Sequence, residues 1–96
     1  MPIWQHFYEI TKIPRPSKHE EQILAFLKKF AEEHNLDYAQ DKTGNIVIRK
    51  GATPGMEDRE TIILQGHIDM VCEKNSDVEH DFYKDPIKTK ITDGWI

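Results

Sequence analysis

The sequence predicts an α/β protein in which two N-terminal helices are followed by strands of a mixed sheet. Before residue 34 the apolar residues recur at helical spacing. After it they alternate with polar residues or form short runs bounded by glycine, proline and asparagine, which is typical of strands and turns. The chain has 96 residues, of which 38% are hydrophobic and 31% charged. That length and composition suit one small globular domain.

The charge balance and the residue usage exclude several classes of protein. The formal net charge is −4 and basic residues lie among acids, so no basic stripe is present to bind a nucleic acid backbone. No stretch approaches the ~20 apolar residues of a membrane span, and the first residues do not resemble a secretory signal. The single cysteine excludes an intrachain disulfide and suits a reducing compartment. We therefore expect a cytoplasmic protein that binds neither nucleic acid nor membrane.

A first helix is predicted to begin at Pro2, because proline is tolerated in the first turn of a helix. Ile3, Phe7 and Ile10 then recur on one face. The prolines at positions 14 and 16 forbid a longer helix, since proline cannot donate the intrahelical hydrogen bond. The first helix is therefore short.

A second helix is predicted between residues 17 and 35. Ser17 followed by Glu20 matches a capping box, in which a serine hydroxyl and a glutamate satisfy the first backbone N–H groups. The apolar residues of the range 23–31 form a stripe of helical period, and this stripe ends near His34 and Asn35. We expect the stripe to pack into the core.

A hairpin and two further strands are predicted after the helices. Residues 36–41 alternate, 42–45 read as a turn and 46–48 as the returning strand, so the range is predicted to form a hairpin. Residues 50–58 are predicted to be an exposed loop. Residues 61–64, Thr-Ile-Ile-Leu, are predicted to be a strand buried on both faces. A polar loop over 73–85 then leads to a strand at 88–91 and a turn at 93–94.

The tripeptide His67-Ile68-Asp69 is the leading candidate for chemistry. It follows the predicted strand at 61–64, and ligands of open α/β sheets bind beyond the carboxyl ends of strands. Side chains two residues apart project to one side of an extended segment, so His67 and Asp69 converge if the strand continues through them. A metal-bound imidazole normally donates its second N–H to a carboxylate or a carbonyl. The pair therefore predicts His67 as a metal ligand and Asp69 as a catalytic carboxylate that orients the site.

A simpler interpretation competes with this one. In it, His67 is a structural histidine at a strand end, with its ring nitrogens already hydrogen-bonded, and Asp69 is a surface residue beside it.

Two other catalytic motifs do not match the sequence. A kinase catalytic loop needs arginine at the position of Ile68 and asparagine five residues after Asp69, whereas Asn75 is the sixth. A zincin needs His-Glu-x-x-His on a helix, which the sequence lacks. His80 is expected in a solvated acidic loop, and Cys72 is expected to be a partly buried thiol.

Residues 64–71, Leu-Gln-Gly-His-Ile-Asp-Met-Val, resemble the first active-site motif of a family of zinc-dependent exopeptidases. The family is that of the aminoacyl-histidine (Xaa-His) dipeptidases, also called cytosolic non-specific dipeptidases. Separated matches continue in order along nearly the whole chain, at residues 7–10, 13–17, 20–21, 41–45, 74–77, 80–82 and 85–87. Cys72 departs from the proline that many members of the broader family carry there, which removes a fixed φ and restores a backbone donor.

The resemblance implies a catalytic domain with a mixed sheet flanked by helices, interrupted by a smaller lid or dimerisation domain. It also implies that His67 ligates one of two zinc ions per active site, which manganese or cobalt can replace, and that Asp69 orients or tunes the site. Water activated by the two ions would hydrolyse dipeptides such as carnosine-like Xaa-His. The family further uses a bridging aspartate, two adjacent glutamates, one of them the general base, and other ligands, and none of these has a counterpart in this sequence.

We therefore expect residues 1–96 to be the N-terminal portion of a zinc-peptidase catalytic domain, an incomplete part that is inactive by itself. The intact enzyme would be a cytosolic metallodipeptidase that acts on dipeptides, and the resemblance leaves a homodimer open. The alternative is a non-catalytic, stand-alone α/β domain that binds a partner protein.

Overall fold

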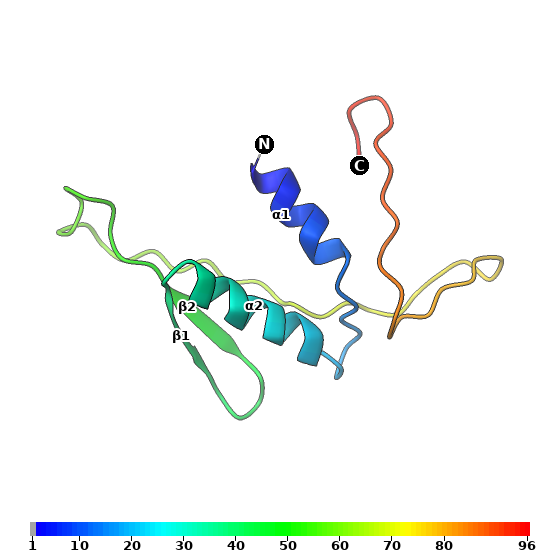
Figure 1. Ribbon diagram of the computed structural model, residues 1–96, viewed down its shortest axis with the longest axis horizontal. Helices are drawn as coiled ribbons and strands as arrows, with labels where there is room; N and C mark the ends of the chain where they lie inside the picture. The colour runs from blue at the N-terminus through cyan, green and yellow to red at the C-terminus, as the bar shows by residue number, and fades with distance from the viewer. Residues whose placement is uncertain (1) are drawn as a thin grey trace. The chain divides into compact units, whose positions relative to one another are not determined.

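The computed structural model describes residues 2–96 and contains two helices followed by a two-stranded antiparallel sheet (Figure 1). The elements are α1 (Pro2–Thr11), α2 (Glu21–Glu33), β1 (Asp37–Gln40) and β2 (Ile46–Arg49). The chain divides into two compact units. The first unit combines the residues up to Ile23 with Ile68–Ile96, and the second unit is Leu24–His67. The first unit is thus built from two segments that lie far apart in the sequence.

Helix α1 begins at Pro2 and ends before the two prolines, as predicted. Thr11 is buried at its last position, and the Thr11 hydroxyl donates to the carbonyl oxygen of Tyr8 at 2.7 Å. The apolar face of this helix remains largely in contact with solvent, since Ile3 is 68% exposed and Phe7 is 39% exposed. Local signals therefore set the limits of α1, while its apolar stripe gains little burial within the described residues.

The N-terminal end of α2 differs from the prediction. The prediction of a capping box at Ser17 is wrong, because the helix begins only at Glu21. The Glu20 carboxylate accepts a hydrogen bond from the backbone N–H of Lys18 at 2.8 Å, and Lys18 has a positive φ of 69°. A residue in that left-handed region cannot belong to the helix, so Ser17 is separated from the helix start and its hydroxyl is left for another partner.

The C-terminal end of α2 lies where the sequence predicts it. Asn35 has a φ of 53°, a conformation that asparagine tolerates better than most residues. The N–H of Leu36 donates to the carbonyl of Ala31 at 2.8 Å, and the N–H of Asn35 donates to that of Glu32 at 3.1 Å. These two bonds form a Schellman motif, which satisfies carbonyls that have no partner within the helix. Of the predicted apolar stripe, Ile23 and Ala31 are buried.

The predicted hairpin is confirmed, with β1 and β2 antiparallel in the register Asp37↔Arg49 to Gln40↔Ile46. Its turn is organised by the Asp41 carboxylate, whose Oδ1 accepts the backbone N–H groups of residues 43, 44 and 45 at 2.8–2.9 Å. Gly44 has a φ of 105°, which side chains disfavour. The Tyr38 hydroxyl donates to Glu32 at 2.9 Å, so β1 is also tied to α2 within the second unit.

Two predicted strands are wrong. Residues 61–64 form no strand, and Ile62, Ile63 and Leu64 are 83%, 86% and 93% exposed, not buried on both faces. Residues 88–91 also form no strand. Both segments have strand-forming residues, but the residues that the structure describes offer them no ladder of hydrogen bonds. The turn at 93–94 does form, closed by a single antiparallel bridge between Thr92 and Trp95.

The predicted loops at 50–58 and 73–85 contain no helix or strand, in agreement with the sequence, and Figure 1 draws the chain after β2 without regular elements. The sheet within residues 2–96 consists of two antiparallel strands, β1 and β2. Within the same range, neither helix has the length and apolar character needed to cross a membrane.

Candidate functional site

The His67-Ile68-Asp69 tripeptide lies in an extended segment without regular structure. The imidazole of His67 is exposed and belongs to the second unit, whereas Asp69 is half-buried and belongs to the first. An exposed imidazole is accessible to a metal ion, and a half-buried carboxylate is one whose direction the surrounding protein can fix. The two residues therefore suit the roles predicted for them, each considered in its own unit.

Asp69 is held by a segment that lies far from it in the sequence. Pro16 and Met70 form a parallel bridge, in which the N–H of Met70 donates to Arg15 at 2.9 Å and the N–H of Ser17 donates to Met70 at 3.1 Å. This pairing brings the Ser17 hydroxyl to Asp69, where it donates to Oδ2 at 2.6 Å. The same hydroxyl lies 3.4 Å from the Met70 carbonyl oxygen. The candidate carboxylate is thus oriented by two backbone bonds and one side-chain bond.

Arg15 anchors this junction from the other side. Its guanidinium donates to the carbonyl oxygen of Ile10, at the end of α1. Partial burial lowers the pKa of Arg15 from its ordinary value, because removal from water disfavours the charged form. The flanking residues Pro14 and Pro16 each have a fixed φ, which restricts the backbone on both sides of Arg15. The segment that carries Ser17 is therefore stiff where it meets Met70.

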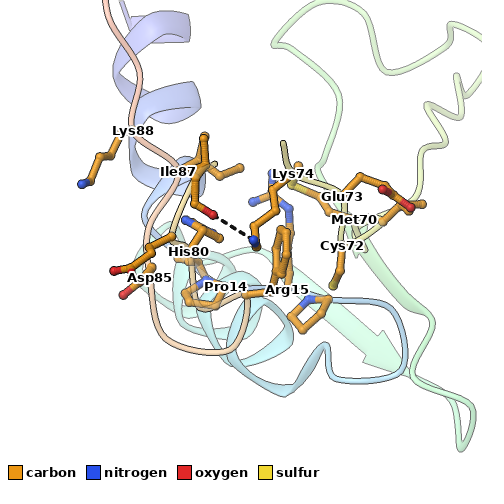
Figure 2. A pocket seen from close by; sticks show the side chains of 16 residues that line it. Pro14, Arg15, Met70, Cys72, Glu73, Lys74, His80, Asp85, Ile87 and Lys88 are labelled. Carbon is orange, nitrogen blue, oxygen red and sulfur yellow. Dashed lines mark hydrogen bonds between the residues drawn. The ribbon is translucent and has the colours of Figure 1, made fainter. Parts of the chain in front are cut away.

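A cleft of about 370 Å³ opens in the first unit beside this junction. Figure 2 shows charged side chains around it, and the Lys74 ammonium group donates to the carbonyl oxygen of Val78 at 2.8 Å. The volume falls in the range of small-molecule pockets. Basic and acidic groups both line the cleft, so its charge favours no single class of ligand: the charged lining residues are Arg15, Glu73, Lys74, Glu79, Asp85 and Lys88.

Two further residues that the sequence singled out line the cleft. Cys72 is an exposed free thiol, so the prediction of a partly buried thiol is wrong. His80 is half-buried and its ring packs edge-on against Phe82, with centroids 4.9 Å apart. The polar loop that contains His80 is therefore less solvated at this position than the sequence predicts, because the aromatic side chain shields the imidazole.

The donor set for a metal ion is incomplete in the described residues. Among residues 2–96, no group of three or more histidine, cysteine, aspartate or glutamate side chains is arranged to hold a metal ion. Catalytic zinc sites use three protein ligands. His67 and Asp69 have suitable chemistry, an imidazole and a carboxylate, but residues 2–96 by themselves do not supply the three ligands of a catalytic zinc site.

Ser17 is the residue at this site that sequence reasoning missed. Its spacing to Glu20 matches a helix cap, a pattern that predicts a different partner for its hydroxyl. A second signal was present, because a proline on either side of Arg15 is an unusual start for a helix and typical of an extended segment. Nothing in the sequence, however, indicates that this segment pairs with Met70.

Comparisons with known proteins agree with the resemblance around His67. No protein-family model matches the chain. The cytosol non-specific dipeptidase of Escherichia coli (strain K12) is 47% identical over 95 residues, which are 99% of this chain and 20% of that protein. The crystal structure of aminoacylhistidine dipeptidase from Vibrio alginolyticus matches 96% of this chain and 19% of its own, with a TM-score of 0.91 and 49% identity.

The chain thus spans about 20% of the length of the relatives that it matches. Its two helices and two-stranded antiparallel sheet reproduce part of the aminoacylhistidine dipeptidase structure. These findings show that the chain is homologous to the cytosol non-specific, or aminoacylhistidine, dipeptidases over that part of their length.

Proposed function

We propose that this chain is the N-terminal portion of the catalytic domain of a metal-dependent dipeptidase that hydrolyses Xaa-His dipeptides. The observation that carries the proposal is the likeness to aminoacylhistidine dipeptidase over 96% of the chain, with a TM-score of 0.91 and 49% identity. A shared fold does not by itself fix an activity. The proposal therefore also depends on His67 and Asp69, whose exposure and hydrogen bonding suit a ligand and an orienting group.

In this proposal His67 contributes one zinc ligand and Asp69 orients the site. The remaining ligands and the general base come from residues outside 1–96, because the described residues hold no complete donor set. Strands from outside this range complete a mixed sheet, and the exposed run at 61–64 is the natural place for such pairing. Residues 1–96 are inactive on their own, and the intact enzyme works in the cytoplasm, as the name of the Escherichia coli relative suggests.

The test is a set of variants of the full-length protein, with zinc content and hydrolysis of β-Ala-His as the measurements. We expect His67→Ala to reduce zinc occupancy and, with it, activity by at least ~100-fold, since a lost ligand costs more than the ~10–100-fold typical of an outer partner. We expect Asp69→Ala to lower activity by ~10–100-fold with a smaller loss of zinc, because a group that orients a site contributes less to holding the metal.

His34→Ala is the matched control for His67, because His34 is also exposed and also belongs to the second unit. It should keep both zinc and activity. Full zinc content and unchanged turnover in both the His67 and Asp69 variants would contradict the dipeptidase proposal. That result would favour the alternative, a non-catalytic domain that binds a partner protein.

A further inference from the structure

The hydroxyl of Ser17 and the carboxylate of Asp69 are joined across 52 positions of the sequence. The distance between Ser17 Oγ and Asp69 Oδ2 is 2.6 Å. This is the length expected when a hydroxyl donates to a charged carboxylate, and such bonds are about twice as strong as those between neutral groups. The contact is therefore strong enough to select one orientation of the Asp69 side chain.

The backbone around both residues holds the two groups in place. The N–H of Ser17 donates to the carbonyl of Met70, and the N–H of Met70 donates to the carbonyl of Arg15. Pro16 is buried between these bonds. Because both partners are fixed through their neighbours, the hydroxyl does not have to follow a moving carboxylate, and little side-chain entropy is lost in forming the bond.

The Ser17 hydroxyl has no role in the helix that follows it. Helix α2 begins at Glu21, and the nearby backbone N–H of Lys18 is satisfied by Glu20. Ser17 is also exposed, so its side chain fills no part of the core. The described interactions of its hydroxyl are those with Asp69 and Met70.

From this geometry we propose that Ser17 is a positioning residue of the dipeptidase site, which acts by fixing the direction of the Asp69 carboxylate. The proposal rests on the function proposed above, in which Asp69 orients the site. The two oxygens of a carboxylate are rigidly joined, so holding Oδ2 also sets the direction of Oδ1. Ser17 touches no reacting atom in this proposal, and its whole effect passes through Asp69.

The test compares Ser17→Ala, Ser17→Thr and Asp69→Ala, alone and combined, in the full-length enzyme with its metal bound. We expect Ser17→Ala to lower kcat for β-Ala-His by about 10-fold, the effect of one lost hydrogen bond to a charged group. KM and zinc content should stay unchanged, because neither depends on the orientation of Asp69 alone. Ser17→Thr should restore most of kcat, since threonine keeps the hydroxyl and the exposed position accommodates a methyl group.

A double-mutant cycle separates positioning from a structural effect. If Ser17 acts through Asp69, then adding Ser17→Ala to Asp69→Ala should lower kcat no further. Ser76→Ala is the control, because Ser76 is an exposed serine in a turn of the same unit and should keep the activity unchanged.

Three outcomes would overturn the inference. An unchanged kcat in Ser17→Ala would show that the hydroxyl is dispensable. If Ser17→Ala lowered kcat by the same factor in the wild-type and Asp69→Ala backgrounds, Ser17 would act on the fold and not through Asp69. A fully active Asp69→Ala enzyme would instead remove the role assigned to Asp69 in the proposed function, and the role of Ser17 with it.

Discussion

Residues 21–49 and residues 50–67 differ in how much of their predicted structure they form. The first region contains α2, β1 and β2, all within a few residues of their predicted positions. The second region contains no helix or strand, although its Thr-Ile-Ile-Leu run is at least as apolar as β2. Strand-forming residues are thus present in both, and only one region forms strands.

The availability of a hydrogen-bond partner explains the difference. Strand β2 finds β1 across a short turn, so its backbone groups are paired locally. A strand that is not part of a hairpin must receive its backbone hydrogen bonds from a distant segment. Residues 61–64 form no such ladder with the described residues. Sequence pattern therefore indicates which residues can form a strand, while the presence of a neighbour decides whether they do.

The largest expected contrast is between two isoleucines in these regions. Ile23→Ala should reduce the free energy of unfolding by about 2–4 kcal/mol, because Ile23 is 3% exposed and its removal leaves a cavity. Ile63→Ala should change it by less than about 0.5 kcal/mol, because Ile63 is 86% exposed. Urea unfolding of the 96-residue chain, followed by circular dichroism, measures both. Comparable losses in the two variants would mean that residues 61–64 are buried after all.

A second contrast concerns two glycines. Gly44→Ala should destabilise the hairpin by about 1–2 kcal/mol, because a φ of 105° is strained for any residue with a Cβ. Space is not the cause, since a Cβ at Gly44 would meet its nearest neighbour, Leu24 Cδ1, at 3.6 Å. Gly66→Ala should be neutral or slightly stabilising, because its φ lies outside the left-handed region and a Cβ meets no atom within 4 Å. Amide hydrogen exchange in β1 and β2 would report the loss, and unchanged protection in Gly44→Ala would refute it.

The smallest effect is a pH dependence confined to the hairpin turn. The side-chain amide of Asn45, followed by backbone N–H groups, lowers the pKa of Asp41 from its ordinary value of 3.8 by stabilising the charged form. The unfolded chain therefore takes up a proton at higher pH than the folded turn. The stabilisation of the folded turn by Asp41 is complete above pH 3.8, and it is lost as the pH falls through the lowered pKa of Asp41.

Amide exchange or NMR chemical shifts of residues 43–45, followed as the pH is lowered below 3.8, would show this loss. Asp41→Asn supplies the control, because its side chain accepts hydrogen bonds but does not titrate in this range. The same pH profile in wild type and Asp41→Asn would assign the dependence to another group.

Local chemistry made much of the fold predictable. Pro2, Asn35 and the Asp41–Asn45 turn all act on neighbours within a few positions, so their effects can be read from the sequence alone. The strands at 61–64 and 88–91 could not be predicted correctly, because no sequence pattern states which partner is present. The role of Ser17 could not be predicted for a related reason. Its hydrogen bond to Asp69 joins residues that are 52 positions apart in the sequence.

The sequence pattern is enough to propose His67 and Asp69 as site residues, but it does not indicate which segment holds Asp69 in place. The residues around His67, together with separated matches along the chain, resemble these dipeptidases, and the homology over about 20% of their length agrees with that resemblance. His67 and Asp69 remain predictions as ligand and orienting group. No sequence pattern indicates that Arg15, Pro16 and Ser17 form the segment that holds Asp69, because backbone pairing depends on geometry more than on residue type.

The Ser17–Asp69 bond also has a consequence for the sequence of folding events. The α2–β1–β2 region precedes Asp69 in the sequence, and its contacts are local, so it needs no pairing with a distant segment. The Asp69 carboxylate can be oriented only after the ends of a 52-position loop have met. Closing a loop of that size costs entropy that grows with the logarithm of its length. The group assigned to chemistry is thus among the last in this part of the chain to reach its final geometry.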